Sequence, residues 1–446
     1  MSVLIKLKNL NNYQNELIFN HLQIKKQFDE EKNNNFITNT EDINLFKKYT
    51  INNEYCLAIP KSFHYQYLQT IPSALYTLYP KININNCNIN LLPRQLEIRE
   101  ETLNILNNSK SLLLSLYTGF GKTIFAIYLL FKIKLKTIIL CHRNIIIKQW
   151  VDSINKYLPD LDIYILDNKP NNKTRIIECD IMIANPINIP KLELNNYLNF
   201  GLLIIDEVHT ICTESFSKCL FYIFPKYMIG LSATPERSDG MDKIIQYFIG
   251  PDVIVKKMSR EFNVYKFQTG IKIESKLTSQ GTIDWNSVLD IQCNNQKRNN
   301  IIVNLVRYFI NRTILILVKR KDHALLLKKL LIENDIDEKD IDTFFGTKKF
   351  CNYDCKILIA TYSKGGVGFD FPRLDMLITA ADVEAGFQQY IGRIFRRDDT
   401  TPIYIDLLDE NNIIKKHSKV RTKVCKENGG LIKNFHKIFP TFFQLF

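Results

Sequence analysis

The sequence lacks a zinc-type cysteine pattern. None of its ten cysteines forms a C-x-x-C pair, and the closest two, Cys351 and Cys355, have no histidine or cysteine partners at zinc-site spacing. This absence argues against a structural zinc site. We expect reduced and mostly buried thiols.

The sequence also lacks a long apolar run. Polar or charged residues interrupt every apolar segment before it reaches membrane-spanning length. The N-terminal stretch MSVLIKLKNLNNYQ has no apolar core followed by a cleavage site. We therefore expect an intracellular protein that is neither secreted nor embedded in a membrane.

The composition is that of a folded chain with an excess of positive charge. At 446 residues, of which 46% are hydrophobic and 24% charged, the chain is globular rather than disordered, and its length predicts roughly two to four domains. Lysine and arginine total 59 against 46 acidic residues, a net charge of +13 that favours polyanionic partners such as nucleic acid or an acidic membrane surface. AT-rich coding would inflate lysine in the same way, so charge alone leaves the partner open.

Short apolar runs alternate with helical segments from about Pro93 onwards. Runs that are apolar on both faces and separated by helix-length connections predict a parallel sheet covered by helices. The first series is SLLLSL, TIILC (137–141), IYIL (163–166), IMIA (181–184), LLIID (202–206) and YMIGLS (227–232). The second series is ILILV (314–318), DTFF (342–345), KILIAT (356–361), MLIT (376–379) and IYIDLLD (403–409). The sequence therefore predicts an α/β fold with two tandem lobes.

These patterns divide the chain into five expected segments. The N-terminal segment is rich in Asn and Lys, with one helical candidate and strand-like pieces, so it predicts a small α+β accessory domain. A run of lysines and arginines near the C-terminus predicts either a water-facing helix or a phosphate-binding patch. The expected boundaries are 1–90 for the accessory domain, 91–251 for lobe 1, 252–294 for a linker or β extension, 295–412 for lobe 2 and 413–446 for a basic tail.

The stretch SLYTGFGKTIFA closes an apolar strand and opens a helix. It matches a phosphate-binding loop except that Leu116 stands at the first glycine position. In such a loop, backbone amides at a helix start face the phosphates, Lys122 reaches the β- and γ-phosphates, and Thr123 binds Mg²⁺. Gly119 and Gly121 let the chain approach closely. The alternative is a helix that merely begins with GKT.

Two further elements follow later strands of the first series. LLIIDEVH ends a buried strand with Asp206 and Glu207, where Asp206 can hold hydrated Mg²⁺ and Glu207 can deprotonate the attacking water. His209 follows, and GLSATPERSDG places the hydroxyls of Ser232 and Thr234 where they could form hydrogen bonds with the Asp206–His209 region. Taken alone, the acids could simply cap a helix, and the second element could be a proline-containing loop.

The second series carries its own polar elements. YSKGGVGFDFP is another glycine-rich turn, with Asp370 at its end. FQQYIGRIFRR places Arg393 and Arg396 three apart, which predicts one helix face. Two guanidinium groups there suit a phosphoryl group in its transition state. A basic, solvent-facing helix end is the alternative.

Taken in order, these segments resemble the motifs of superfamily 2 helicases of the DExH type, over about residues 91 to 409. LLPRQLEI resembles the Q motif, LYTGFGKT motif I, DEVH motif II, SAT motif III, GGVGFD motif V and QYIGRIFR motif VI. The resemblance implies RecA-like lobes that bind ATP and Mg²⁺ between them. It also favours a working phosphate loop, since this superfamily often replaces the first loop glycine.

The resemblance assigns roles position by position. It gives catalytic roles to Lys122, Asp206, Glu207, Gln389, Arg393 and Arg396. It gives nucleotide contacts to Gln95, Thr118, Gly119, Phe120, Gly121, Lys122, Thr123, Gly368 and Asp370, with Thr123 and Asp206 on Mg²⁺. It gives coupling to His209, Ser232 and Thr234, and nucleic-acid contacts to Arg143, Asn185 and Thr361. Two positions depart from the family pattern: His142 replaces the usual proline of motif Ia, and Arg94 replaces the usual aromatic residue beside Gln95.

TPERSDG after SAT resembles the branch that contains XPB, phage recombination helicases and the poxvirus transcript-release helicase. We therefore expect an ATP-dependent translocase or helicase that tracks DNA rather than RNA, in the 3′-to-5′ direction, and acts with RNA polymerase in transcript release. A cytoplasmic location or packaging in the virion fits that type. The alternatives are a repair or recombination helicase and, from another class, a non-hydrolysing ATP-gated clamp in a transcription assembly.

Overall fold

The structure is a computed structural model, and it describes most of the chain. The described residues are 2–24, 43–68, 79–167, 173–233, 242–258, 260–279, 281–348, 350–366, 371–384, 386–397 and 399–445. Within these ranges, no helix is both long enough and apolar enough to cross a membrane.

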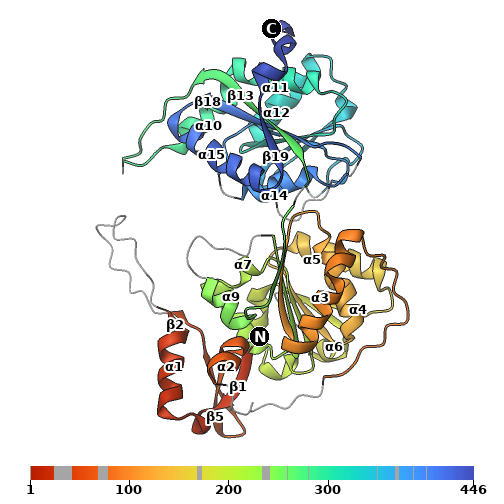
Figure 1. Cartoon of the computed structure of the whole chain (residues 1–446), viewed down its shortest axis with the longest axis vertical. Coiled ribbons are helices and arrows are strands. Elements are labelled where there is room, and N and C mark those ends of the chain that lie inside the picture. Colours follow the sequence, from red (N-terminus) through yellow and green to blue (C-terminus); the bar gives the residue numbers. More distant parts are fainter. Residues whose placement is uncertain are drawn as a thin grey trace. The chain divides into compact units, whose positions relative to one another are not determined.

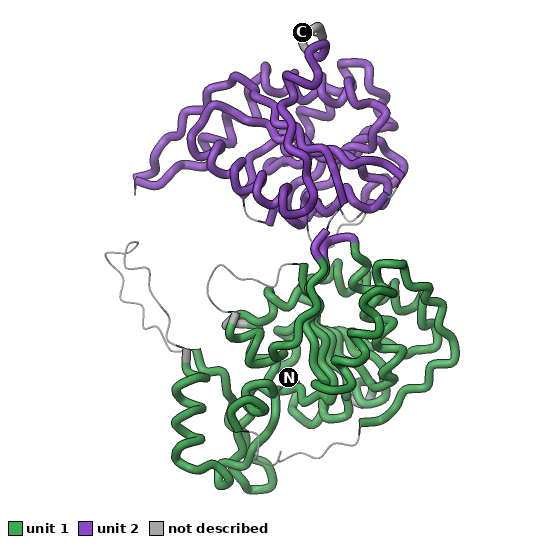
Figure 2. Tube along the Cα trace, viewed as in Figure 1, with its two compact units in different colours: residues 1–116, 120–256 green, residues 117–119, 257–446 purple. Residues whose placement is uncertain are grey.

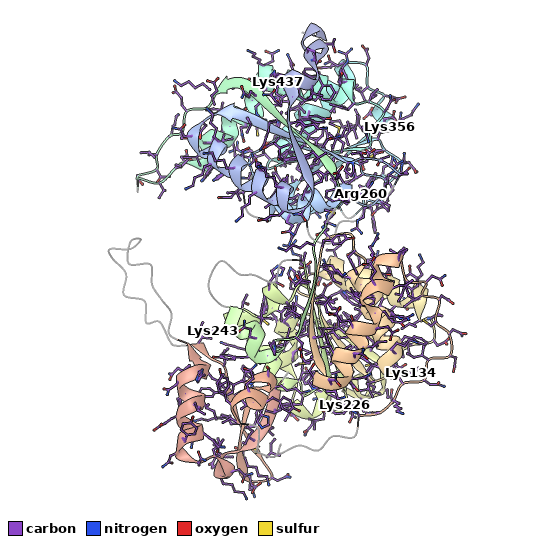
Figure 3. The ribbon with its side chains drawn as sticks, in the orientation of Figure 1. Lys134, Lys226, Lys243, Arg260, Lys356 and Lys437 are labelled. Carbon is purple, nitrogen blue, oxygen red and sulfur yellow. The ribbon has the colours of Figure 1, made fainter. Side chains whose placement is uncertain are left out.

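The chain forms two compact units (Figure 2). The first comprises residues 1–116 and 120–256, and the second comprises residues 117–119 and 257–446. Each unit is built on its own parallel sheet and is described by itself. Basic side chains are distributed over both units, as Lys134 and Lys226 on the first and Lys356 and Lys437 on the second illustrate (Figure 3).

The first unit contains a seven-stranded sheet in its described residues (Figure 1). In spatial order its strands are β12 (Val253–Lys256), β6 (Ser111–Leu116), β11 (Tyr227–Ser232), β10 (Leu202–Ile205), β7 (Thr137–Leu140), β9 (Ile181–Ala184) and β8 (Ile163–Leu166). All the pairings are parallel, and β6, β7, β9 and β10 are buried along their whole length. Burial on both faces is why these strands read as continuous apolar runs.

Helices cover the sheet because their apolar residues recur at helical spacing. In α5 (Asn144–Tyr157) the buried residues Ile146, Trp150 and Ile154 repeat every four positions and form one stripe. The other helices of this sheet are α3 (Pro93–Ser109), α4 (Lys122–Ile133), α6 (Lys173–Glu178), α7 (Val208–Ile211), α8 (Glu214–Ser217) and α9 (Asp242–Phe248).

The N-terminal region is an α+β element that shares a core with the first sheet. It consists of the antiparallel strands β1 (Ser2–Lys6), β5 (Glu54–Pro60) and β4 (Lys47–Ile51), the short pair β2 (Gln23–Ile24) and β3 (Ile43–Asn44), and helices α1 (Asn12–Leu22) and α2 (Lys61–Tyr67). Ile5 and Phe63 belong to the same buried cluster as Phe248 of α9. Lys61 Nζ donates to the carbonyl of Lys226 at 2.8 Å, and burial lowers the pKa of Lys61 to about 8.

The second unit contains another seven-stranded parallel sheet in its described residues. In spatial order its strands are β15 (Ile341–Phe344), β16 (Ile357–Thr361), β14 (Ile314–Val318), β17 (Met376–Thr379), β18 (Ile403–Glu410), β13 (Phe262–Lys272) and β19 (Gly430–Asn434). Its helices are α10 (Trp285–Asn294), α11 (Gln296–Tyr308), α12 (Lys321–Glu333), α13 (Tyr362–Gly365), α14 (Phe387–Ile391), α15 (Asn412–Glu427) and α16 (Phe435–Ile438). The predicted α/β chain with two parallel-sheet lobes and a small N-terminal α+β region is confirmed.

Two of the expected segments have no counterpart as separate pieces. The segment 252–294, expected to be a linker or a β extension, contains β12 of the first sheet and β13, which pairs with β18. The expected basic tail at 413–446 contains α15, which packs on β18, and β19, which pairs with β13 as the edge strand. Both segments complete the second sheet because their apolar residues, such as Val264 and Phe435, are buried in its core.

We predict that ending the chain after residue 411 unfolds the second unit. The truncation exposes the edge of β13 and removes Arg421 from the buried carboxylate of Asp406. Asp406 then keeps only Lys266 as its charged partner, and removing one partner of a buried ion pair costs up to about 3–5 kcal/mol. Limited proteolysis and thermal unfolding measure the effect.

The matched control is the double change Lys415→Ala and Lys419→Ala, which removes two exposed charges of α15. We expect it to leave the melting temperature unchanged. A truncated chain whose second unit resists protease like the full chain would show that residues 412–446 are an appendage.

Candidate functional site

The loops that follow the strands of the first sheet meet at one edge. Because the strands are parallel and in register, with Ile204 opposite both Ile139 and Ile229, their carboxyl ends lie at the same level. In open α/β sheets, ligands bind at this edge. The loops after β6, β7, β9, β10 and β11 therefore converge.

The loop after β6 has the backbone of a phosphate-binding turn. Gly119 and Gly121 have φ values of 96° and 93°, a left-handed conformation that favours glycine. α4 begins at Lys122, directly after Gly121. Leu116 replaces the first glycine without strain, because it ends β6 with its side chain fully buried. Lys122 Nζ donates to the Leu116 carbonyl at 3.1 Å, across the loop.

Gln95 braces this loop from α3. Its side-chain carbonyl accepts from Leu92 N at 2.8 Å, and its Nε2 donates to the Gly121 carbonyl at 3.1 Å. A Cβ on Gly121 would lie 2.5 Å from that nitrogen, so only glycine fits there. Arg94 Nε donates to the Phe120 carbonyl at 3.1 Å. In this structure the fully buried Gln95 therefore holds the loop backbone. Recognition of adenine by Gln95 stays a proposal.

Asp206 lies buried at the end of β10. Its Oδ2 accepts from the indole Nε1 of Trp150 at 2.9 Å. Burial and the neighbouring charge of Glu207 raise the pKa of Asp206 to about 6, while the Trp150 hydrogen bond and the positive charge of Lys122 act in the opposite direction. The influence of Lys122 shows that the loop lysine and this carboxylate share one electrostatic environment.

Glu207 is held in an uncommon conformation. Its φ of 50° is left-handed, which a residue with a side chain adopts at a cost of about 1–3 kcal/mol. Its Oε2 is buried and accepts no hydrogen bond from the described residues, and His209 Nδ1 lies 3.5 Å from it. A strained backbone and an unsatisfied carboxylate oxygen at a strand end are features of functional sites.

A chain of side-chain contacts connects the loops. His209 Nδ1 lies 3.1 Å from Ser232 Oγ, so the loops after β10 and β11 are in contact. Thr210 Oγ1 lies 3.2 Å from Nδ1 of His142, whose carbonyl accepts from Asn185 Nδ2 at 3.1 Å. Burial and the charges of Arg143 and His209 lower the pKa of His142 to about 4, so this ring is neutral near pH 7.

Three of the residues predicted from the sequence lie outside the described residues. These are Thr234, Gly368 and Asp370. The contact predicted for Ser232 with the Asp206–His209 region is present, whereas the structure gives no account of the partner hydroxyl at 234.

The remaining predicted residues of the second unit lie at the end of β16 and in the connection from β17 to β18. Thr361 ends β16, and its Oγ1 lies 3.1 Å from Ser363 Oγ. Gln389 lies on α14. The buried Arg393 belongs to a short 3-10 turn, Gly392–Ile394, and its Nη2 donates to the Gly366 carbonyl. Arg396 lies beyond that turn, so the prediction that both arginines share one helix face is wrong, because the helical segment ends at Ile394.

Sequence reasoning missed Trp150. It is fully buried on α5 and donates to Asp206, which holds one carboxylate oxygen in place. The available signal was its place on the apolar stripe of α5, but the stripe alone does not show that the indole nitrogen reaches a strand end 56 residues away.

The residues at this edge fit a magnesium nucleotide. Asp206 offers a carboxylate and Thr123 a hydroxyl, the oxygen ligands that Mg²⁺ prefers. The Glu207 oxygen that accepts no hydrogen bond from the described residues fits a water molecule or a hydrated ion. The start of α4 and Lys122 fit phosphate oxygens.

Comparisons with known proteins give the relatives of this chain. A family model described as the res subunit of type III restriction enzymes matches residues 88–237. A putative helicase of Invertebrate iridescent virus 6 is 39% identical over 371 residues, which cover 77% of this chain and 83% of the relative. The DNA 3'-5' translocase XPB2 of Sulfurisphaera tokodaii is 23% identical over 386 residues, which cover 74% of this chain and 86% of that protein.

A solved structure shares the fold. Yeast Dbp5 with the change L327V, bound to RNA and ADP BeF3, aligns with a TM-score of 0.54 over 80% of this chain and 98% of that chain, at 13% sequence identity. At this identity the likeness concerns the fold alone.

We predict that Asp206→Asn stabilises the ligand-free protein at pH 8. The folded pKa of about 6 exceeds the unfolded value of about 3.9. The ionised carboxylate therefore lowers the folding stability by its full amount above pH 6. This loss of stability becomes smaller as the pH falls toward 4. With EDTA present, the melting temperature of Asp206→Asn should exceed that of the unchanged chain by a few degrees at pH 8, and the excess should shrink between pH 6 and pH 4.

Asp152→Asn, which changes an exposed carboxylate on α5, is the matched control and should show no such pH dependence. A melting temperature that Asp206→Asn lowers at pH 8, or an excess that stays constant with pH, would contradict this assignment of the buried charge.

Proposed function

Because this chain belongs to the superfamily 2 helicases, which are ATP-hydrolysing enzymes, we propose that it is a DNA-dependent ATPase that translocates on DNA. The observation that carries the proposal is the pair of carboxylates at the end of β10, the buried Asp206 and the partly buried Glu207. Asp206 accepts a hydrogen bond from Trp150 and is influenced by the charge of Lys122, while Glu207 presents an oxygen that accepts no hydrogen bond from the described residues.

Each side chain has a distinct task in the proposed reaction. Lys122 leaves the Leu116 carbonyl and binds the β- and γ-phosphate oxygens. Thr123 and Asp206 hold Mg²⁺, which would neutralise phosphate charge when bound. Glu207 Oε2 accepts a proton from the attacking water, which its position orients. Arg393 and Arg396 stabilise charge on the transferred phosphoryl group.

The contacts around His209 supply a route from hydrolysis to movement. His209 lies 3.5 Å from Glu207 Oε2 and 3.1 Å from Ser232 Oγ. A change in the partners of Glu207 therefore reaches the loop after β11 through a single imidazole. We propose that this imidazole couples the state of the nucleotide to the nucleic-acid path, to which Arg143, Asn185 and Thr361 contribute.

DNA is the proposed track. The net charge of +13 favours a polyanion, and the relative from Sulfurisphaera tokodaii is named a DNA translocase. The narrower proposal of transcript release, with RNA polymerase as partner, rests on the resemblance of SAT and TPERSDG to the transcript-release type. Release of RNA from stalled transcription complexes, compared with unwinding of branched DNA, distinguishes it from repair.

We predict that Lys122→Ala and Glu207→Gln each remove ATP hydrolysis stimulated by nucleic acid. Lys122→Ala removes the phosphate cation and should weaken ATP binding, whereas Glu207→Gln keeps the shape of the site and should retain binding. Phosphate release with single-stranded DNA, duplex DNA and RNA as stimulators, together with nucleotide binding, measures both effects. Normal turnover in either variant, or stimulation by RNA alone, would refute the corresponding part of the proposal.

We predict that Arg393→Ala and Arg396→Ala lower turnover far more than they weaken ATP binding. Arginines in this role contribute about 10³- to 10⁵-fold in rate. Arg397→Ala is the control, because Arg397 bonds to Asp399 at 2.6 Å at the surface. Equal losses in binding and in turnover would count against a role in the transition state.

A further inference from the structure

Four consecutive buried residues connect β17 to the segment before α14. They are Ala380, Ala381, Asp382 and Val383, and all are at most 6% exposed. We call them the 380–383 segment. It lies a few residues before α14 and the turn that carries Arg393, so its position bears on where that helix starts.

Side chains from four helices hold the backbone of this segment. Arg298 of α11 donates to the Ala380 carbonyl, and Tyr362 of α13 donates to the Ala381 carbonyl at 2.5 Å. Gln292 of α10 accepts from Asp382 N at 3.2 Å. Arg421 of α15 donates to the Val383 carbonyl at 2.5 Å and to Asp382 Oδ1 at 2.8 Å.

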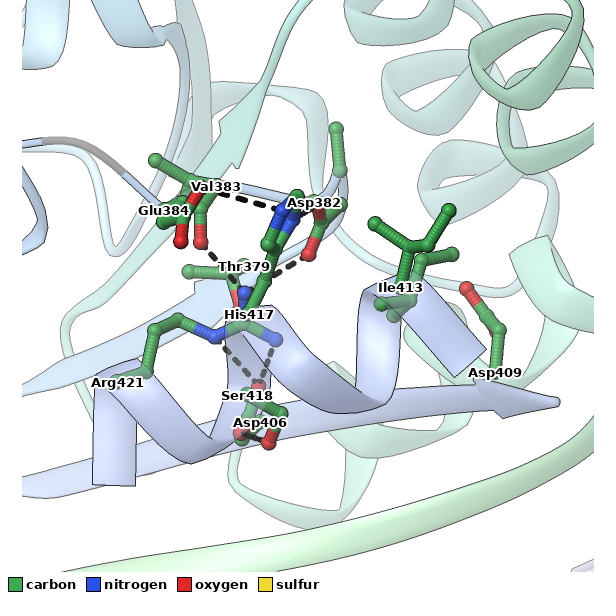
Figure 4. A network of polar contacts seen from close by, with 12 residues as sticks. Thr379, Asp382, Val383, Glu384, Asp406, Asp409, Ile413, His417, Ser418 and Arg421 are labelled. Carbon is green, nitrogen blue, oxygen red and sulfur yellow. Dashed lines mark hydrogen bonds and ion pairs between the residues drawn. The ribbon is translucent and has the colours of Figure 1, made fainter. Parts of the chain in front are cut away.

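Two aspartates of β18 anchor the two arginines. Arg421 bonds to Asp406 Oδ1 through Nε at 3.0 Å and Nη2 at 2.8 Å, and Figure 4 shows its guanidinium between Asp406 and the 380–383 segment. Arg298 Nε bonds to both oxygens of Asp409 at 3.1 Å. Burial would raise the pKa of Asp406, but Arg421 and Lys266 hold it below its usual value.

The two arginines hold the segment from opposite faces of the sheet. Asp406 and Asp409 are three residues apart on one strand, and side chains alternate between faces with a period of two. The burial clusters agree, since Leu407 packs in one cluster and Tyr404 in the other. A buried ion pair adds little net stability, so two such pairs on one short segment favour a role in fixing geometry.

The held segment is connected to Arg393 by direct contacts. Tyr362, which bonds to Ala381, packs its ring against Tyr390 of α14 at 4.9 Å between centroids. Phe387 of α14 packs against Tyr404 of β18 at 5.0 Å. Arg393 donates to the Gly366 carbonyl, at the end of α13.

We propose that Arg298 and Arg421 are positioning residues for α14, which keep Arg393 oriented for phosphoryl transfer by holding the 380–383 segment from both faces of the sheet. The proposal rests on the proposed function of Arg393. It assigns neither arginine a contact with ATP. Loss of the contacts that either arginine makes with the 380–383 segment therefore lowers turnover and leaves the KM for ATP nearly unchanged.

The test is Arg421→Lys, which keeps a positive charge beside Asp406 but cannot also reach Val383. The expected result is a kcat lowered about tenfold with the KM for ATP within about twofold. Hydrogen exchange should rise in residues 386–394. In an Arg393→Ala background, Arg421→Lys should cause no further loss of turnover.

Arg312→Lys is the matched control. Arg312 bonds to Asp375 and to the Thr401 carbonyl, at 3.1 and 3.2 Å, and so joins the amino ends of β17 and β18. It should change neither kcat nor exchange in residues 386–394. Equal effects of the two substitutions, or an equal loss of turnover with and without Arg393, would overturn the proposal.

Tyr362→Phe removes the hydrogen bond to Ala381 without changing a charge, and it serves if Arg421→Lys does not fold. It should show the same pattern at smaller amplitude, and unchanged kcat and exchange would overturn the proposal. Exchange also separates the two claims. A chain that hydrolyses no ATP refutes the proposed function. In such a chain, hydrogen exchange that Arg421→Lys raises in residues 386–394 still supports the positioning role, and unchanged exchange overturns it.

Discussion

The parallel pairing of the first sheet is the constraint on which the site depends. Because β6, β10 and β11 run in the same direction and in register, the loops after Leu116, Ile205 and Ser232 all emerge at one edge. Residues separated by more than a hundred positions in sequence then face one another. Any change that reversed or shifted one strand would separate Lys122 from Asp206, even if both motifs remained intact.

Both units bury carboxylates on or directly after a strand, but the partners of these carboxylates differ. In the second unit, Asp406 and Asp409 are fully buried and each is paired with an arginine. In the first, Asp206 is buried with a raised pKa, and Glu207 keeps an oxygen that accepts no hydrogen bond from the described residues. The paired carboxylates of the second unit hold a backbone segment, whereas the carboxylates of the first unit keep the capacity to bind a ligand.

The sequence was sufficient where the signal was local. Apolar runs such as IMIA and ILILV predicted β9 and β14, and the spacing around Lys122 predicted the strand, glycine turn and helix. The sequence was insufficient where pairing with a neighbouring strand decides whether a segment becomes a strand. β13 and β19 are irregular in pattern, and only their neighbours make them strands of a sheet. The hydrogen bond from Trp150 to Asp206 and the brace of Gln95 on the loop are likewise tertiary contacts that spacing does not encode.

The central claim is that the unsatisfied carboxylate oxygen of Glu207 is the base that activates water beside a magnesium nucleotide. A crystal structure of the full chain with Mg²⁺ and a non-hydrolysable ATP analogue tests it most directly. The account predicts a water molecule bonded to Glu207 Oε2 and in line with the γ-phosphate, with Asp206 in the hydration shell of the metal. A nucleotide bound away from Lys122, or a Glu207 oxygen that pairs with a protein side chain while nucleotide is present, would contradict it.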